Sequence, residues 1–438
     1  MIKIHNPFDS KISYAACLGV DWGHSKNCFQ LLAPDSSQVE RIEVAADPAS
    51  MNQFIRTLRE RFPQGKIGLV SEQSKGALVN LLLDYPFVEL MAANPHAAAK
   101  FRRSLHPAGS KTDPIDSSAL LRMIFTHRDR MSMIARGDEA SRRLDGISRH
   151  RRSVVEQRVE VSNRLTSLLL EYYPQVLPML GAENWDPISL AFLRKWPSYS
   201  CLMKSKDETL ERFYYANRSR SKGAIGKRLD CRRASAPLSS DPLLEELGEM
   251  QLSNYVEQLS VLNKQIQTLD KQLRRAFREH PDREIFSSLP GAGPTMAPRL
   301  AAVFTCDRDR YQSCSQLQAY SGIAPIKLQS GNREYTFMRR FCPKFIRQSF
   351  HEWAGLSAQY SPWAKACYKM LRERGKGVGK AKRALAFKWM RILFRCWKNK
   401  QPYDEVTYVK SLIKHNSPVV KKMKELGFID EKNNILFT

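Results

Sequence analysis

The sequence predicts a mixed α/β domain at the N-terminus, followed by a long and mostly helical region. Three observations lead to this fold class. Short β-type runs alternate with helical segments over the first 130 residues, two long stretches in the middle carry apolar residues at spacings of three and four, and the last third is rich in amphipathic helices and glycine turns. With 438 residues, of which 42% are hydrophobic, the chain can form two or three separate cores.

The first domain, residues 14–130, is expected to begin with a meander of three strands, because the runs AACLGV, NCFQLLA and QVERIEVA are short and apolar or nearly alternating. A helix follows, with Asp47 as its N-cap and Pro48 at its first position. The chain continues as strand (KIGLVSE), helix, strand (FVELMAA) and a last helix that Asp113 is expected to cap. This order of elements is typical of a ribonuclease-H-like fold.

Four carboxylates meet at one place in such a fold. Asp21 ends the first strand, Glu72 ends the fourth, and Asp113 and Asp116 share one face at the start of the last helix. Clustered carboxylates repel one another unless cations neutralise them, and oxygen ligands suit hard cations. The set therefore predicts a site for Mg²⁺, with Mn²⁺ as a substitute, in which two ions could polarise a phosphate. Taken singly, each acid also fits a plainer role as a turn, surface or capping residue.

The middle of the chain, residues 131–282, is expected to connect two domains. Apolar residues recur with heptad spacing in 144–168, where two arginines interrupt the pattern, and without interruption in 252–276. Heptads do not report which helix they pack against, so a helical hairpin within one chain and a dimerising coiled coil fit equally well. Between them lies a stretch, roughly 174–240, that reads as irregular, with apolar helical pieces and a basic run.

Residues 283–402 form the last expected domain, and 403–438 a short helical tail. The segment LPGAGPTMAPRL places Gly291 and Gly293 in a tight turn before a helix. The turn resembles the hairpin of helix-hairpin-helix DNA-binding motifs, in which backbone N–H groups meet a phosphate. It fits an ordinary turn between helices equally well.

The balance of charges points to a polyanionic partner. The chain has 70 Lys and Arg against 44 Asp and Glu, a formal net charge of +26, and nucleic acid is the usual partner of so basic a protein. A basic segment, RERGKGVGKAKR, leads into an amphipathic helix and is expected to contact phosphates.

The cysteines and the apolar runs indicate the compartment. The nine cysteines are scattered without the spacing of a zinc site, so they are expected to be buried and reduced. No signal-peptide core and no membrane-spanning run is seen. The sequence therefore predicts a cytoplasmic protein without a membrane partner.

The segments GVDWGHSKN, VSEQSKG, KTDPIDSSAL and, further on, PGAGPTMAPRL and LQAYSGIAPIKLQSGNRE resemble those of DEDD transposases of the insertion-sequence "one-ten" family, relatives of the Piv DNA invertases. The resemblance covers about 15–130 and 284–400. It implies a RuvC-like N-terminal domain, a coiled-coil connection and a C-terminal transposase domain. It also implies a tetramer that cuts and rejoins double-stranded donor and target DNA, guided by a non-coding bridge RNA of the element.

The resemblance further implies that a serine of the C-terminal domain attacks DNA, and that the acidic site of a neighbouring protomer completes the active centre. The serine falls on Ser330 in KLQSGNR, where relatives usually carry a Ser-Ser-Gly-Gly type run. Ser321 is a weaker candidate, because relatives tend to have an apolar residue there. With no histidine nearby in sequence, a metal on the acids is the expected activator. The cations expected to contact nucleic acid around the serine are Lys327, Arg333, Arg339 and Arg340.

Other functions share parts of this pattern. A metal-dependent nuclease of the Holliday-junction type would use the acids to hydrolyse branched DNA without a protein–DNA adduct, and a DNA invertase would act without an RNA guide. A non-catalytic scaffold would use only the basic surface, and it has no need of four clustered negative charges. The sequence contains no RNA-specific motif with stacking aromatic residues, so the RNA guide rests on the resemblance alone.

Overall fold

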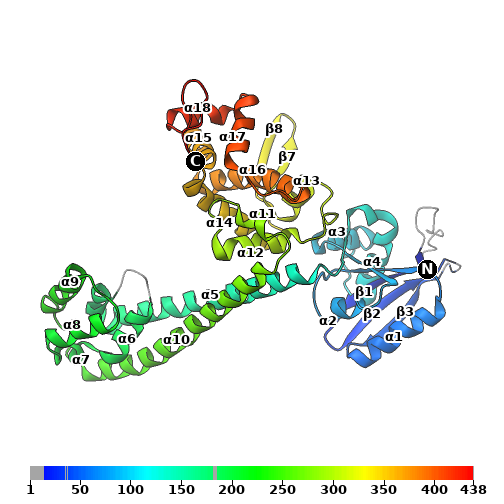
Figure 1. Cartoon of the computed structure of the whole chain (residues 1–438). Helices are drawn as coiled ribbons and strands as arrows, with labels where there is room; N and C mark the ends of the chain where they lie inside the picture. The colour runs from blue at the N-terminus through cyan, green and yellow to red at the C-terminus, as the bar shows by residue number, and fades with distance from the viewer. Residues whose placement is uncertain (1–13, 35, 37, 181–184, 438) are drawn as a thin grey trace. The chain divides into compact units, whose positions relative to one another are not determined.

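The computed structural model describes residues 14–34, 36, 38–180 and 185–437 (Figure 1). The chain divides into two compact units, one that ends at Arg136 and one that begins at Gly137.

The first unit is built on a six-stranded sheet with the strand order β3-β2-β1-β4-β5-β6. β1 pairs antiparallel with β2 and parallel with β4, so the meander and the first crossover meet at β1. The predicted α/β class is therefore confirmed for this unit. The strands are β1 (Tyr14–Trp22), β2 (Lys26–Leu32), β3 (Glu40–Ala45), β4 (Lys66–Ser71), β5 (Val88–Ala92) and the short β6 (Ser132–Met133).

Four α-helices accompany the sheet: α1 (Pro48–Arg61), α2 (Ala77–Leu82), α3 (Pro95–Leu105) and α4 (Asp113–His127). A single 3₁₀ turn, η1 (Arg128–Arg130), follows α4. Asp47 caps α1 as predicted, because its side chain accepts a hydrogen bond from the backbone N–H of Ser50 at 2.9 Å.

Two details of the helices differ from the sequence prediction. Helix α3 was not predicted, although Asn94 caps it by accepting from the N–H groups of His96 and Ala97. The predicted cap of α4 is wrong by one residue. Thr112 is the N-cap and Asp113 is the first helical residue, so the Asp113 carboxylate is not used for capping.

The sheet separates two apolar layers. Side chains of α1 and α2 pack with Leu18 and alternate residues of β1 on one face, and side chains of α3 and α4 pack with Cys17 on the other. Because successive side chains of a strand point to opposite faces, β1 contributes to both layers. This places α4 on one face of the central strand.

Gly19 in β1 marks the closest contact between the sheet and α4. A Cβ atom at this position would lie 2.2 Å from the carbonyl oxygen of Ser117 and 2.3 Å from the amide nitrogen of Leu121. Both are backbone atoms of α4, so neither can rotate away. Only glycine lets the helix lie this near the strand.

The second unit begins with a helical hairpin formed by α5 (Glu139–Tyr172) and α10 (Pro242–Arg278). The two helices run antiparallel within one chain, and Arg151 Nε lies 2.5 Å from Asp270 Oδ1. Arg151, one of the arginines that interrupt the first heptad pattern, is thus neutralised across the pair. Of the two readings of the heptads, the structure shows the hairpin, while a coiled coil between chains stays a prediction.

The described residues between the two long helices form a small helical bundle at the end of the hairpin (Figure 1). Its own apolar core contains Trp196, Phe192 and Tyr214 together with the ends of α5 and α10. The apolar helical pieces predicted for this stretch are confirmed, but the prediction that they form an irregular segment was wrong, because they pack around one core. The elements are η2 (Pro174–Met179), α6 (Pro187–Lys195), α7 (Tyr199–Met203), α8 (Asp207–Ala216) and α9 (Lys222–Arg233), and we call this part the tip bundle.

The rest of the second unit is mostly helical, as predicted, and its core contains four fully buried tryptophans: Trp353, Trp363, Trp389 and Trp397. The C-terminal tail adds Val409 and Met423 to the same core. The elements are α11 (Arg283–Ser287), α12 (Gly293–Phe304), α13 (Cys314–Tyr320), β7 (Ile326–Ser330), β8 (Arg333–Phe337), α14 (Lys344–Tyr360), α15 (Pro362–Glu373), α16 (Val378–Lys398), α17 (Glu405–Lys414) and α18 (Pro418–Glu425).

The burial of the cysteines and the character of the helices bear on two predictions made from the sequence. All nine cysteines are free thiols, but only Cys17, Cys28 and Cys367 are buried and the other six are half-buried. The expectation of general burial was therefore wrong for most of them. Among the described residues, no helix combines the length and the apolar character needed to cross a lipid bilayer.

The contact at Gly19 gives a first prediction. Gly19→Ala forces a methyl group into the backbone of α4 and should lower the free energy of unfolding of the first unit by roughly 3 kcal/mol. Denaturant unfolding measures this. The control is Gly146→Ala in α5, where an added Cβ meets nothing within 4 Å, so a better helix former should leave stability equal or slightly higher. Equal stability of the Gly19 variant and the wild type would contradict the account of this contact.

Candidate functional site

The four predicted acids lie at one end of the sheet in the first unit. β1 and β4 are parallel neighbours in which Val20 is paired with Ser71, so Asp21 and Glu72 follow side by side. Asp113 and Asp116 lie in the first turn of α4, which packs against β1. Residues far apart in sequence therefore come together where the expected fold places them.

Electrostatics shows that the four carboxylates act on one another. Burial, followed by the charges of Asp116, Asp113 and Glu72 in that order, raises the pKa of Asp21 from 3.8 to about 6. Burial, followed by the charge of Asp116, also raises the pKa of Glu72. Lys111 lowers both values but does not offset the increase. The cluster thus holds negative charge at a cost in free energy.

A cation that the sequence analysis missed belongs to this cluster. Arg102 of α3 donates from Nη1 to Asp116 Oδ1 at 2.5 Å, and both side chains are mostly buried. At the same end of α4, the Ser117 hydroxyl donates to the Asp113 carbonyl at 2.8 Å. The one sequence signal for Arg102 was the Asn-Pro pair before its helix, which favours a helix start.

The donor set fits a hard divalent cation. Four carboxylates supply only oxygen ligands, and the Asp113 carboxylate is exposed and not used as a cap. In the described structure, no three of these acids bring their oxygens within 4.8 Å of one another. Like charges repel one another, so carboxylates at this end of the sheet approach one another more closely when a cation neutralises them.

A second group of possible ligands lies in the second unit. Asp138, His280 and Cys306 bring ligand atoms within 4.8 Å, from three segments whose spacing in sequence gave no sign of it. The Asp138 oxygens already accept from the N–H groups of Ser141 and Cys306 at 2.8 and 2.9 Å. His280 Nδ1 accepts from the Asp282 N–H at 3.1 Å, so in a neutral ring Nε2 carries the hydrogen and cannot ligate a metal.

The ionisation of this second group agrees with a structural role. Burial lowers the pKa of His280 and favours the neutral ring, whereas burial and Asp138 raise the pKa of the Cys306 thiol to about 11. A neutral imidazole beside a protonated thiol is neither a nucleophile pair nor a ready metal site. The group ties the start of α5 to the ends of α10 and α12.

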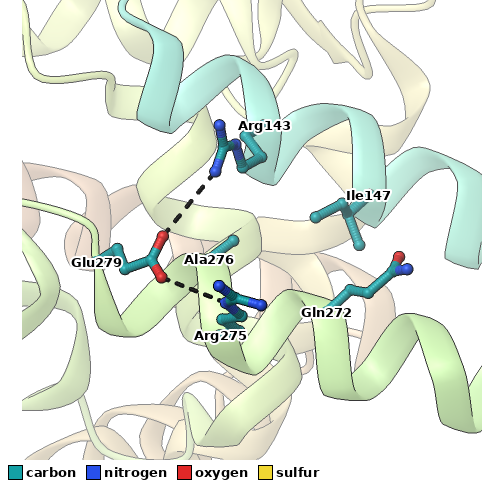
Figure 2. Close-up of a pocket in the computed structure, with 6 residues that line it drawn as sticks. All are labelled: Arg143, Ile147, Gln272, Arg275, Ala276 and Glu279. Atoms are coloured by element: carbon teal, nitrogen blue, oxygen red, sulfur yellow. Dashed lines mark ion pairs between the residues drawn. The ribbon is translucent and has the colours of Figure 1, made fainter.

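Figure 2 shows a surface hollow at the base of the hairpin, lined by residues of α5 and of the end of α10. The carboxylate of Glu279 lies between two guanidinium groups, 3.9 Å from Arg143 and 3.5 Å from Arg275. The remaining lining side chains are Ile147, Gln272 and Ala276. The side chains that line the hollow include no nucleophile, and its one carboxylate is paired with two arginines. These ion pairs join the two helices, and the hollow does not offer a catalytic site.

Ser330 ends β7 at the tip of an exposed two-stranded hairpin in the second unit. It is paired with Arg333 across a two-residue loop, in which Gly331 has the positive φ of +55° that short hairpin loops favour. The weaker candidate, Ser321, is fully buried, and its hydroxyl donates to the Gln318 carbonyl at 3.1 Å. In this position its hydroxyl is not accessible to a DNA phosphate.

The cations near Ser330 are not equivalent. Arg333 shares the face of Ser330, because directly paired residues of a hairpin point to the same side. Lys327 points to the other face, three residues before Ser330, and its Nζ lies 2.9 Å from Glu334. Arg339 and Arg340 follow β8, with Arg340 exposed and Arg339 half-buried.

The predicted glycine turn packs against α14. Gly291 has φ +70°, and a Cβ there would lie 3.0 Å from the carbonyl carbon of Leu356, while the Trp353 indole donates to the Pro290 carbonyl at 3.0 Å. Packing alone therefore accounts for Gly291. Gly293 has φ +51° and is exposed, with open space where a Cβ would be. Contact of either glycine with nucleic acid stays a prediction.

Comparisons with known proteins agree with this arrangement of a separate acidic domain and a C-terminal domain. The model of the DEDD transposase domain of IS110 elements matches residues 18–174, and the model of transposases of the IS116/IS110/IS902 family matches residues 283–369. Together the two matches cover more than half of the chain. Residues 175–282, which include most of the tip bundle, lie outside both.

Individual relatives match over most of their length. The mini-circle putative transposase for IS117 of Streptomyces coelicolor is 27% identical over 88% of this chain and 95% of its own. The IS116 uncharacterized 44.8 kDa protein of Streptomyces clavuligerus is 22% identical, over 82% and 88%. The IS900 uncharacterized 42 kDa protein of Mycobacterium paratuberculosis is also 22% identical, over 89% and 97%. With its acidic cluster at the end of the sheet and both family domains in order, the chain belongs to the IS110 family of DEDD transposases, enzymes of DNA transposition.

Proposed function

We propose that the chain is an RNA-guided DNA recombinase whose acidic cluster holds divalent cations and whose nucleophile is Ser330. The observation that carries the acidic part is the raised pKa of Asp21, to about 6, which reflects burial and the three neighbouring carboxylates. Carboxyl groups whose pKa is raised by burial and by neighbouring acids, even beside Arg102 and Lys111, are typical of a catalytic cation site. Asp21, Glu72, Asp113 and Asp116 would hold Mg²⁺, or Mn²⁺ in its place, and the ions would stabilise negative charge on the scissile phosphate.

The proposed chemistry of Ser330 is a phosphoryl transfer. Its Oγ forms a bond to the phosphorus of a DNA phosphodiester, the bond from phosphorus to one deoxyribose oxygen breaks, and the hydroxyl proton passes to solvent while that oxygen leaves protonated. The phosphoserine link keeps the ester for rejoining, when a DNA hydroxyl attacks and frees the serine. Arg333, paired with Ser330 across the hairpin, is placed to stabilise charge on the phosphate oxygens.

Ser330 and the acids belong to different units of the chain. We propose that the acidic site of one protomer serves the serine of a neighbour in a tetramer, as the family resemblance implies. The position of Ser330 at the tip of an exposed hairpin supports this, because a nucleophile on a protruding element can enter a site formed elsewhere.

The nucleic-acid partners in the proposal are donor and target DNA and a structured non-coding RNA. The formal net charge of +26 supports a large phosphate surface. The segment from Arg372 to Lys380 supports it locally, because four of its nine residues are exposed Lys or Arg and three are glycines. A second candidate, hydrolysis of branched DNA by the acids alone, shares the cation site and differs in having no covalent adduct.

The raised pKa of Asp21 gives a prediction for the metal-free protein. Because the folded value of about 6 exceeds the ordinary 3.8, the folded state binds the proton more tightly, and stability falls as the pH rises from about 4 to 6. Asp21→Asn removes this loss, so at pH 7 without metal the variant should unfold a few degrees above the wild type, and near pH 4 the two should agree. Thermal unfolding followed by circular dichroism measures this.

Added Mg²⁺ completes the test of Asp21. It should raise the unfolding temperature of the wild type at pH 7 and leave that of Asp21→Asn unchanged. The control is Glu60→Gln, which makes the same change of charge at an exposed position of α1 and should keep the response to Mg²⁺. An equal response to Mg²⁺ in wild type and Asp21→Asn would refute the cation site.

The role of Ser330 is tested with end-labelled DNA that carries the junction of the element. Wild-type protein with its copurifying RNA and Mg²⁺ should form a label that migrates with protein on a denaturing gel. Ser330→Ala should reduce this adduct to background, whereas Gln329→Ala, on the opposite face of β7, should retain it. DNA cleavage that persists without adduct in Ser330→Ala would establish the hydrolytic alternative instead.

Treatment of the wild-type protein with ribonuclease before DNA is added tests the RNA guide. The treatment should abolish the adduct if RNA is the guide, and an unchanged adduct would favour an invertase without a guide.

A further inference from the structure

The tip bundle carries a strongly basic surface that the site described above does not use. Between residues 204 and 233 the chain has ten Lys and Arg against four Asp and Glu. Asp207 forms ion pairs with Arg232 and Arg233, and Asp230 forms another with Arg233. Seven other cations of this segment are exposed and make no ion pair within the described part of the chain. They are Lys204, Lys206, Arg212, Arg218, Arg220, Lys222 and Lys227.

These cations are held on a rigid base. Phe213 and Tyr214 of α8, with Ile225 and Leu229 of α9, are buried in the core of the tip bundle. The Tyr214 hydroxyl donates to the Met179 carbonyl at 3.0 Å. Charged side chains on a packed helix pair lose less freedom on binding than the same charges on a loose chain.

The link between α8 and α9 concentrates the charge. Arg218 lies in the left-handed region at φ +65°, and the Ser219 N–H donates to the Tyr214 carbonyl at 3.0 Å, which makes the turn tight. Arg220 follows, and Lys222 is the first residue of α9. Three exposed cations thus lie within five residues, on a turn whose backbone is fixed by hydrogen bonds.

The exposed side of α9 carries two glycines in addition to its basic residues. Gly223 and Gly226 lie inside the helix, where alanine would be more stable, and an added Cβ would meet nothing within 4 Å at either. Packing against the described residues of the bundle does not explain these glycines. Together with Lys222 and Lys227 they leave a surface that an extended polyanion can approach closely.

We propose that this surface of α8 and α9 binds the phosphate backbone of double-stranded DNA. DNA is favoured as the occupant because the family acts on DNA. In addition, the seven exposed cations, which form no ion pair with any described residue, complement a phosphate backbone that carries one charge per strand at each step. The surface lies outside both family matches, so it adds a contact to the shared domains. The proposal rests on membership of the family and on these residues, and it requires neither the serine nor an RNA guide.

The test uses the full-length protein freed of RNA by ribonuclease, with Arg218→Gln, Arg220→Gln and Lys222→Gln combined. Binding to a fluorescent DNA duplex is measured by anisotropy across a range of salt concentrations. Each lost phosphate contact should reduce the slope of log K against log salt by about 0.9, so the triple variant should lose roughly 2.7 in all. The affinity should fall to a similar degree for duplexes of unrelated sequence, because phosphate contacts carry no sequence information.

A matched control removes three exposed cations from the shaft of α10 by combining Lys264→Gln, Lys271→Gln and Arg274→Gln. This variant should keep the wild-type slope, and all three proteins should share one circular dichroism spectrum and unfolding temperature. A wild-type slope in the tip variant, an equal loss in the control, or a loss seen with an RNA duplex but not with DNA would each overturn the proposal.

The same variant separates this inference from the proposed chemistry. At saturating DNA the tip variant should form the Ser330 adduct at the wild-type rate, because the substitutions weaken binding and leave the acids and the serine intact. An adduct rate that falls at saturating DNA while the salt slope is unchanged would show that these cations do not form a binding surface.

Discussion

The contact between Gly19 and the backbone of α4 is the constraint on which the acidic cluster depends. With a side chain at position 19, the carbonyl of Ser117 and the amide of Leu121 could not lie where they do. The strand end that carries Asp21 and the helix start that carries Asp113 and Asp116 would then separate. The geometry of the cluster is thus a consequence of apolar packing one or two turns away from the charges, and the packing energy of the unit offsets the repulsion that the charges create.

The second unit is organised around a long helical hairpin. Its long hairpin is stabilised by an apolar seam and by ion pairs such as Arg151 with Asp270 and Arg143 with Glu279, and its base is fastened by hydrogen bonds around His280. The hairpin ends in the tip bundle with its separate core, and beside its base lies the tryptophan-rich core of the C-terminal domain. The chain therefore presents an acidic site, an exposed serine and a basic surface on three separately packed parts.

The features predicted correctly from sequence were those that local patterns encode. The first five strands of the sheet, the Asp47 cap and the positions of Asp21 and Glu72 follow from alternation, capping and strand ends within a few residues. Arg102 was missed because its helix was not recognised, although Asn94 and a proline begin it. The start of α4 was placed one residue late, because Thr112 and Asp113 both suit a cap and only the backbone conformation decides between them.

Features that depend on tertiary contacts could not be predicted in this way. Asp138, His280 and Cys306 lie close together in the fold, although Asp138 and His280 are more than a hundred residues apart in sequence. Their spacing in the sequence therefore does not indicate that the three side chains form a group. The heptads do not specify which helix each one packs against, and the ion pair between Arg151 and Asp270 identifies α5 and α10 as partners within one chain. The tip bundle read as irregular because its helices are short, and its core forms only once the two ends of the hairpin meet.

The proposed mechanism depends on a site for divalent cations formed by the four acids. Electron paramagnetic resonance of Mn²⁺ titrated into the full-length protein, in the absence of nucleic acid, tests it directly. The sharp signal of free aqueous Mn²⁺ should be suppressed at low ratios of metal to protein, and Asp21→Asn combined with Asp116→Asn should restore it. A free Mn²⁺ signal throughout the titration of the wild type, or equal binding by the double variant, would contradict the claim.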